Sequence, residues 1–230
     1  MEKKLRFAVL LSGSGVYDGA EIHESVLALL ALNKLGIEAV CVAPNVTQYH
    51  TINHLTGEVM EEQRNVLVES ARIARGLIQD TAHFDTNTVD ALLMPGGFGV
   101  AKNFTHWAFE GAQTSILPEI KELIIAFHKA KKPIGAVCMA PTTIAKALEG
   151  IANIQLSVGN TIEKSPYDIK SISEGINETG NIAVMVGVED ISIDSTHKVV
   201  CSPCYMMEAN ISQIYQGIEK TIKQMLHFIS

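Results

Sequence analysis

The sequence predicts an α/β protein in which a mostly parallel central sheet carries helices on both faces. Short apolar runs, each long enough for one buried strand, alternate with longer segments of helical spacing. The first unit comprises a strand over 7–11, a helix over 20–35 and a strand over 37–43, which together form a βαβ unit. Small-residue loops follow several of these strands, as expected where ligands bind at the carboxyl edge of such a sheet.

The next part of the chain interrupts this alternation. Polar residues and turn formers mark Pro44–Gly76 as the main part of an insertion, which we place at about 44–84 and within which 61–75 has helical spacing. A short strand is predicted over 78–84, followed by a buried strand over 89–94. The second strand leads directly into Pro95–Gly99, whose glycines allow the backbone to approach a bound molecule.

The same signals predict the elements of the second half. We expect a helix over 118–130, a strand over 134–137, a helix over 141–148 and an edge strand over 153–159. Strands over 190–194 and 199–202 form a hairpin or lie side by side, and a long helix covers 206–228. Segment 164–180 is polar and turn-rich, and we assign it no element. Without repeats or linkers, residues 1–230 are expected to form a single domain.

Composition narrows the possible functions. The formal net charge of −7 argues against a nucleic-acid-binding surface, which needs clustered Lys and Arg. Four cysteines are too few for a disulfide scaffold, so we expect a reduced, cytoplasmic protein. No apolar stretch approaches the roughly 20 residues that span a bilayer, so no membrane association is expected.

Cys138 is the first candidate catalytic residue. It follows the apolar run Ile134–Val137, and Pro141 suits the first turn of a helix. A cysteine on a sharp strand-to-helix turn faces a helix N-terminus, which favours its thiolate form. This arrangement is a nucleophile elbow, whereas the alternative is an ordinary buried thiol.

Backbone amides and carboxylates near the same edge could assist this thiol. The N–H groups of Gly97 and Met139 are the natural donors to an oxyanion that forms on a substrate bound to Cys138. Glu21 and Glu24 lie three residues apart on the first helix, so they share a face and either could exchange a proton with the thiol. The alternatives are a plain turn at the glycines and solvated carboxylates at a helix start.

Several motifs together resemble one protein family. The stretches that carry the resemblance are Leu11–Glu24, Ile52–Glu58, Arg64–Leu67, Pro95–Asn103 and Val137–Pro141. On these stretches the chain is similar to the ElbB group, also called the sigma cross-reacting protein family, of the PfpI/ThiJ superfamily with its class I glutamine amidotransferase-like fold. The first two stretches are specific to this group.

The resemblance implies a three-layer Rossmann-like, or flavodoxin-like, sandwich. It implies that Cys138 is the elbow nucleophile, that Glu24 is the carboxylate beside it, and that Gly97 and Met139 supply the oxyanion donors, with Gly96 in the same pocket. Members of the group are described as weak glyoxalases that convert glyoxal to glycolate without a cofactor or metal. We therefore expect a small carbonyl substrate and, as is common in the superfamily, a homodimer or larger homo-oligomer.

The chain departs from the superfamily in its histidines. Met139 stands where many related hydrolases place a histidine, and His197 is the first histidine after His128. A standard Cys-His-Glu triad is therefore incomplete, and His23 and His54 are candidate pocket residues instead. Two alternatives stay open: a non-catalytic redox-sensing or binding protein with an oxidisable Cys138 and, with less support, an amidase subunit.

Three other patterns are discounted. Gly13-Ser14-Gly15 lacks the third glycine and the acidic residue of a dinucleotide site. Cys201 and Cys204 have the spacing of a redox pair, but we interpret them as buried or incidental thiols. His50 and His54 are four residues apart on a glycine-bearing loop, which carries little information about metal binding.

Overall fold

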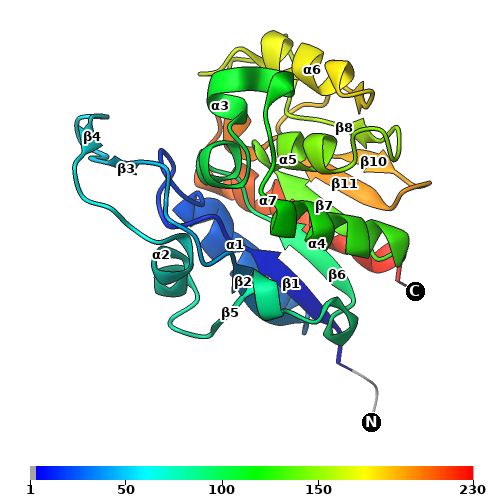
Figure 1. The fold of residues 1–230 in the computed structure, drawn as a ribbon. Helices are drawn as coiled ribbons and strands as arrows, with labels where there is room; N and C mark the ends of the chain where they lie inside the picture. Colours follow the sequence, from blue (N-terminus) through cyan, green and yellow to red (C-terminus); the bar gives the residue numbers. More distant parts are fainter. Residues whose placement is uncertain (1–3, 230) are drawn as a thin grey trace.

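Seven short strands form one central sheet in the computed structural model, which describes residues 4–229 (Figure 1). Every neighbouring pair is parallel except β10 and β11. This confirms the predicted mostly parallel sheet and the hairpin near the C-terminus. The spatial order is β10 (Ser192–Asp194), β11 (Val199–Ser202), β7 (Ile134–Val137), β6 (Ala91–Met94), β1 (Arg6–Leu10), β2 (Glu38–Ala43) and β5 (Ile78–Asp80).

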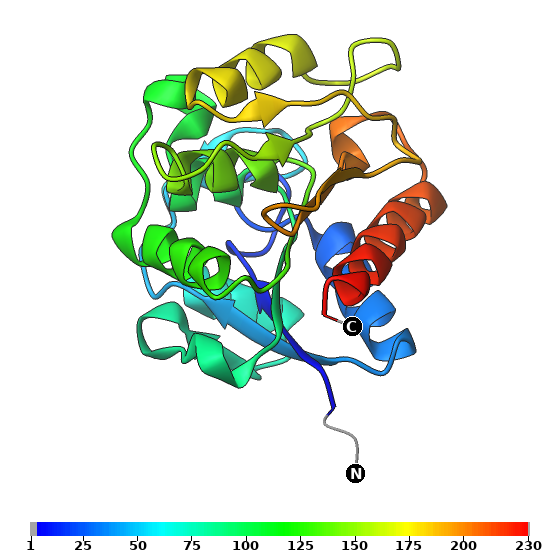
Figure 2. The same ribbon diagram turned by 90° about the vertical axis from the view of Figure 1, so that its right-hand side faces the viewer.

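Helices cover both faces of this sheet. Helices α1 (Ile22–Lys34) and α7 (Ile211–His227) pack together on one face. Helices α4 (Pro118–Lys129) and α5 (Ala140–Ala147) lie on the other face. Figure 2 shows these layers on either side of the sheet, with α4 and α5 in green and α1 and α7 in blue and red. The three-layer sandwich is thus confirmed, and the inner strands β6 and β7 are fully apolar because both of their faces are covered.

Helix α1 presents a different face to the core from the one that its apolar residues suggest. Ile22, Val26 and Leu30 are exposed, whereas Glu24 and Ala28 are buried. Small residues on the inner face let α1 approach its neighbours closely, and the helix thereby turns a carboxyl group inward. This orientation brings Glu24 to the candidate site.

The segment after β2 contains more structure than the insertion predicted from sequence. β3 (Thr51–Ile52) and β4 (Val59–Met60) form a small hairpin at the periphery of the molecule (Figure 1). The helix predicted over 61–75 is shorter, α2 (Val66–Ile73), because the Asn65 side chain accepts the Val68 N–H and caps its first turn. β5 ends at Asp80, whose carboxylate caps the 3₁₀ turn Thr81–His83.

The structure of the segment after α5 differs from two of the expectations. β8 (Gln155–Leu156) pairs with β9 (Ile182–Ala183) in a separate two-stranded sheet, so the prediction of a main-sheet strand at 153–159 is wrong. β10 occupies that edge instead. Between β8 and β9 lies α6 (Ile169–Glu178), in the segment to which we assigned no element.

Two helical segments complete the chain. Helix α3 (Trp107–Glu110) follows a π-helical turn at Val100–Phe104. The terminal helix, predicted from residue 206, begins at Ile211 because Asn210 forms a capping box with Gln213. Across residues 4–229, no helix combines the length and the apolar character needed to cross a membrane.

Candidate active site

Four segments from distant parts of the chain meet at the carboxyl edge of the sheet. They are the loops that follow β1, β6 and β7, and the first turn of α1. β1 pairs with β2 on one side and with β6 on the other, so the chain changes direction across the sheet at β1. Loops next to such a switch point are where open α/β sheets bind ligands.

Cys138 occupies a strained turn between β7 and α5. Its φ angle is +57°, a left-handed conformation that few non-glycine residues adopt. Its N–H donates to the Ser202 carbonyl at 3.0 Å, which holds the turn against the end of β11. A side chain at Gly96 would overlap Cys138 Cβ and lie 2.9 Å from its Sγ, so a glycine is needed there. The predicted elbow geometry is therefore present.

Two groups act directly on the Cys138 thiol. The Gly97 N–H lowers its pKa and the charge of the Glu24 carboxyl raises it, so both groups lie beside the sulfur. Gly97 has a φ angle of +94°, and a Cβ on it would overlap the backbone of Gly19 and Glu21. Met139 directly precedes α5 as its N-cap residue, so its N–H lies at the helix start. The structure therefore brings together the four residues predicted as catalytic.

Glu24 is fully buried, with 0% of its surface exposed. Its Oε2 accepts the Gly96 N–H at 2.9 Å, and its Oε1 accepts the Tyr205 N–H at 3.3 Å. Burial, together with the nearby carboxylate of Glu21, raises the pKa of Glu24 to about 8. At neutral pH Glu24 therefore carries a proton that it can donate.

The Cys138 thiol is protonated in the free protein. Burial, and then the charge of Glu24, raise its pKa well above the ordinary value, while the Gly97 N–H acts in the opposite direction. The expectation that the helix N-terminus favours the thiolate is therefore wrong, because loss of solvation outweighs the helix at a residue that is only 5% exposed. A reaction at this sulfur needs a group that takes up its proton.

A pocket of about 500 Å³ opens beside this centre. Three tyrosines line it together with Glu21, namely Tyr17, Tyr167 and Tyr205. Burial and the proximity of Cys138 raise the pKa of Tyr167 to about 12, which places this side chain near the sulfur. Glu21 also caps α1, because its Oε2 accepts the Glu24 N–H at 2.6 Å.

Sequence reasoning missed these tyrosines as pocket residues. Tyr167 lies in the segment to which we assigned no element, and Tyr205 follows Cys204 in the turn after β11. Tyr17 belongs to the first of the motifs that resemble the ElbB group. Only Tyr17 therefore carried a signal in the sequence.

The two candidate histidines lie away from the sulfur. His23 hydrogen-bonds the Tyr205 hydroxyl through Nδ1 at 2.9 Å, so it reaches the pocket only through that tyrosine. His54 accepts the Tyr17 N–H at 3.3 Å through Nε2, while its Nδ1 lies 3.0 Å from the Ile52 carbonyl. These partners assign His54 the neutral tautomer that carries its proton on Nδ1.

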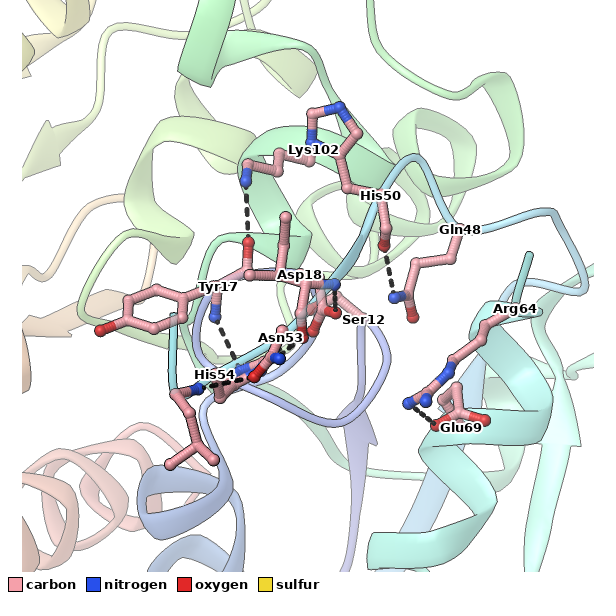
Figure 3. A network of polar contacts seen from close by, with 12 residues as sticks. Ser12, Tyr17, Asp18, Gln48, His50, Asn53, His54, Arg64, Glu69 and Lys102 are labelled. Carbon is pink, nitrogen blue, oxygen red and sulfur yellow. Dashed lines mark hydrogen bonds and ion pairs between the residues drawn. The ribbon is translucent and has the colours of Figure 1, made fainter. Parts of the chain in front are cut away.

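Figure 3 shows His54 within a network of polar contacts that holds the loop after β1. Asp18 accepts the Ile52 N–H at 2.7 Å, and the Lys102 ammonium group donates to the Tyr17 carbonyl at 2.8 Å. The His54 ring packs on Tyr17 with 4.9 Å between the ring centroids. His54 therefore positions the Tyr17 loop and does not contact the thiol.

A conventional histidine partner for Cys138 is missing from the C-terminal part of the site. His197 precedes β11, at the opposite edge of the sheet, where its Nδ1 lies 3.0 Å from Asp194 Oδ2. Cys204 and Tyr205 occupy the turn that follows β11. Within the described chain, no three His, Cys, Asp or Glu side chains gather in a way that could hold a metal ion.

Comparison with known proteins identifies close relatives. The chain is 40% identical over 227 residues to a rat protein called ES1 protein homolog, mitochondrial, covering 97% of this chain and 84% of the relative. It is also 40% identical over 225 residues to human glutamine amidotransferase-like class 1 domain-containing protein 3, mitochondrial, covering 96% of this chain and 82% of the relative. No protein-family model matches the chain.

Solved structures show the same fold. A crystal structure of an isoprenoid biosynthesis protein with amidotransferase-like domain from Ehrlichia chaffeensis has a TM-score of 0.89 and 35% identity, and covers 98% of this chain and 100% of its own. Glyoxalase III of Candida albicans shares the fold at 12% identity, with a TM-score of 0.61 over 96% of this chain and 97% of its own.

The names of the relatives correct one expectation. The rat and human proteins are both called mitochondrial, which contradicts the cytoplasmic localisation expected from the sequence. The cytoplasmic localisation was expected from the low cysteine content. A low cysteine content is typical of proteins in a reducing environment, but it does not identify the compartment. Identity and coverage together show that the chain belongs to the ES1 family of proteins with a class 1 glutamine amidotransferase-like domain.

Proposed function

We propose that the protein is a cofactor-independent glyoxalase that converts small reactive dicarbonyls, with glyoxal as the simplest case, to hydroxy acids through Cys138. The observation that carries this proposal is the position of the sulfur, between the Gly97 N–H and the protonated carboxyl of Glu24, beside an open pocket. We also place the chain in the ElbB group, in line with the similarity to the Ehrlichia isoprenoid biosynthesis protein.

The first step adds the Cys138 sulfur to one aldehyde carbon of glyoxal. A C–S bond forms, and the thiol proton passes to the former carbonyl oxygen, which gives a hemithioacetal. The N–H groups of Gly97 and Met139 are the donors for the charge that develops on this oxygen. Glu24 supports the transfer because its carboxyl contacts the thiol and gives or takes a proton near neutral pH.

The second step moves a hydrogen between the two carbons. A proton leaves the carbon bound to sulfur and one is returned to the neighbouring carbon, so the hemithioacetal becomes a glycolyl thioester without any external oxidant. Glu24 is the group placed to carry this proton. Water then cleaves the thioester, which releases glycolate and restores the Cys138 thiol.

The pocket favours small, uncharged substrates. Glu21 lines its wall, so an anionic substrate would meet the like charge of this carboxylate. The tyrosine hydroxyl groups offer hydrogen bonds to a carbonyl oxygen. The same arrangement supports a glyoxalase more than an amidase subunit, because no histidine of residues 4–229 acts on the Cys138 thiol or on Glu24.

The test is glycolate formation from glyoxal by the wild type and by Cys138→Ala and Glu24→Gln. We expect Cys138→Ala to abolish turnover and Glu24→Gln to lower it about 100-fold, the usual size of a lost general acid–base contribution. Cys41→Ala is the matched control, since Cys41 is a buried thiol in β2 and lies outside the site. Full activity in Cys138→Ala would overturn the proposal.

A further inference from the structure

A second buried thiol lies next to Cys138. Cys204 begins the 3₁₀ turn after β11, and Cys138 follows β7, the parallel neighbour of β11. Val137 is paired with Ser202, and the Cys138 N–H donates to the Ser202 carbonyl at 3.0 Å. The two cysteines therefore leave adjacent strand ends that are bonded to each other.

Both cysteines have an unusual backbone. Cys138 has a φ angle of +57° and Cys204 one of +45°, and these are two of the five non-glycine residues with positive φ among those the structure describes. Such conformations cost free energy and persist where the surrounding structure imposes them. The same conformation at neighbouring strand ends indicates that the fold holds both thiols in fixed positions.

Charge interactions connect the two thiols to one carboxyl group. The charge of Cys204 raises the pKa of Cys138, and burial followed by the charge of Glu24 raises the pKa of Cys204. The Tyr205 N–H, adjacent to Cys204 in sequence, donates to Glu24 Oε1 at 3.3 Å. Glu24 therefore lies close to both cysteines. Cys204 is buried, with 1% of its surface exposed.

The pairing of β7 with β11 brings the two strand ends to a spacing that a disulfide can bridge. Neighbouring strands lie about 4.8 Å apart. A disulfide needs Cα atoms separated by about 4.4 to 6.8 Å. In this structure all four cysteines are free thiols, and Cys204 Sγ contacts Ser202 Oγ at 3.6 Å.

We propose that Cys204 is a resolving thiol that captures oxidised Cys138 as a disulfide, which gives the site a second, hydroperoxide-reducing activity. This inference rests on the reactive Cys138 of the proposed glyoxalase. It adds a function for Cys204, which glyoxal conversion does not use.

The first step consumes a hydroperoxide. Cys138 Sγ attacks the terminal peroxide oxygen, so an S–O bond forms while the O–O bond breaks. The sulfur loses two electrons and becomes a sulfenic acid, and the peroxide is reduced to an alcohol, or to water when it is hydrogen peroxide. The thiol proton passes to the leaving oxygen, with Glu24 as the proton carrier.

The second step forms the disulfide. Cys204 Sγ attacks Cys138 Sγ, so the S–S bond forms while the S–O bond breaks. Hydroxide leaves with the thiol proton of Cys204 as water. An external dithiol then restores both cysteines by exchange. Without Cys204 the sulfenic acid stays open to a second peroxide and proceeds to the irreversible sulfinic acid.

The test maps the oxidised sites in the full-length protein. Reduced wild type, Cys204→Ala and the matched control Cys201→Ala are exposed to about two equivalents of hydrogen peroxide, the amount that carries one thiol to the sulfinic acid. Free thiols are then blocked and the protein is digested with trypsin. Cys138 lies in peptide 132–146, whereas Cys201 and Cys204 share peptide 199–220, so fragment masses assign the partner. Cys201 is a buried thiol within β11.

We expect wild type and Cys201→Ala to show a Cys138–Cys204 bridge and to recover glyoxal turnover in dithiothreitol. Cys204→Ala should show Cys138 carrying two added oxygen atoms and should lose its turnover permanently. A wild type in which Cys138 is over-oxidised or unchanged while Cys204 remains free would overturn the inference, as would a bridge to Cys201.

The untreated samples separate this inference from the glyoxalase proposal. If untreated protein forms glycolate normally but peroxide produces no bridge, only the proposed role of Cys204 is refuted. If the bridge forms in a protein that does not convert glyoxal, only the glyoxalase proposal is refuted. Since the wild-type map by itself shows whether the bridge forms, poor folding of a variant does not change the outcome of the test.

Discussion

Replacing Glu24 with glutamine should change how the stability of the protein depends on pH. Glutamine keeps the size of the side chain and removes the titrating group. In the folded protein the pKa of Glu24 is raised from 4.5 to about 8, mainly by burial and then by Glu21. Between these two values the folded state binds more protons at Glu24 than the unfolded state, so the stability of the wild type falls as pH rises.

The size of the effect follows from that gap. Each pKa unit corresponds to about 1.4 kcal/mol, so a gap of roughly 3.5 units corresponds to about 5 kcal/mol. The loss of wild-type stability caused by ionising Glu24 is absent well below pH 4.5. It grows between the two pKa values and levels off above about pH 8. The free energy of unfolding of Glu24→Gln, relative to that of the wild type, should therefore rise by about 4 kcal/mol as the pH increases from roughly 5 to 9.

Urea unfolding of both proteins at a series of pH values measures this difference. Titrating groups that do not interact with Glu24 contribute equally to the two proteins at a given pH, so they cancel in the comparison. The hydrogen bond that glutamine cannot accept lowers the stability of the variant by an amount that does not depend on pH. A difference that stays constant from about pH 5 to pH 9, or one that shrinks as pH rises, would refute the assignment of a protonated, buried Glu24.

Three further predictions concern packing and capping. Gly96→Ala should destabilise the fold by about 1–3 kcal/mol and slow glycolate formation about 100-fold, since its Cβ displaces the Cys138 thiol. Gly187→Ala, whose Cβ meets only the side chain of Glu163, should do neither, and equal effects in the two variants would contradict this account. Asn210→Ala should cost about 1 kcal/mol in thermal unfolding without changing turnover, through the lost cap of α7. Asp194→Ala should cost about 1–3 kcal/mol, because it leaves two partly buried donors unpaired, the N–H of Gln155 in β8 and the N–H of His197 in the turn before β11, and unchanged urea unfolding would contradict that.

The sequence was sufficient to predict the inner strands and the helices next to them. Strands β6 and β7, and β1 after Arg6, are buried on both faces, so they form continuous apolar runs that are easy to recognise in the sequence. The edges were harder to predict. β8 and β9 contain two residues each, and their pairing in a separate sheet depends on contacts between distant segments.

The residues of the candidate site also differ in how far the sequence could predict them. Cys138, Gly96 and Gly97 follow buried strands, so their meeting at one edge could be predicted from topology. Tyr167 and Tyr205 reach the pocket from loops whose course only tertiary packing defines. The protonation of the thiol could not be predicted either, because burial by residues distant in sequence opposes the local effect of the helix.

The place of β11 in the sheet has a consequence for synthesis of the chain. β7 lies between β6 and β11, and β11 is the last strand of the sheet to leave the ribosome. Until residues 199–205 emerge, one edge of β7 lacks its neighbour and Glu24 lacks the Tyr205 N–H. During synthesis Cys138 therefore lies beside an incomplete edge of the sheet until residues 199–205 emerge. Completion of β11 gives β7 its last neighbour and gives the Cys138 N–H its acceptor, the Ser202 carbonyl.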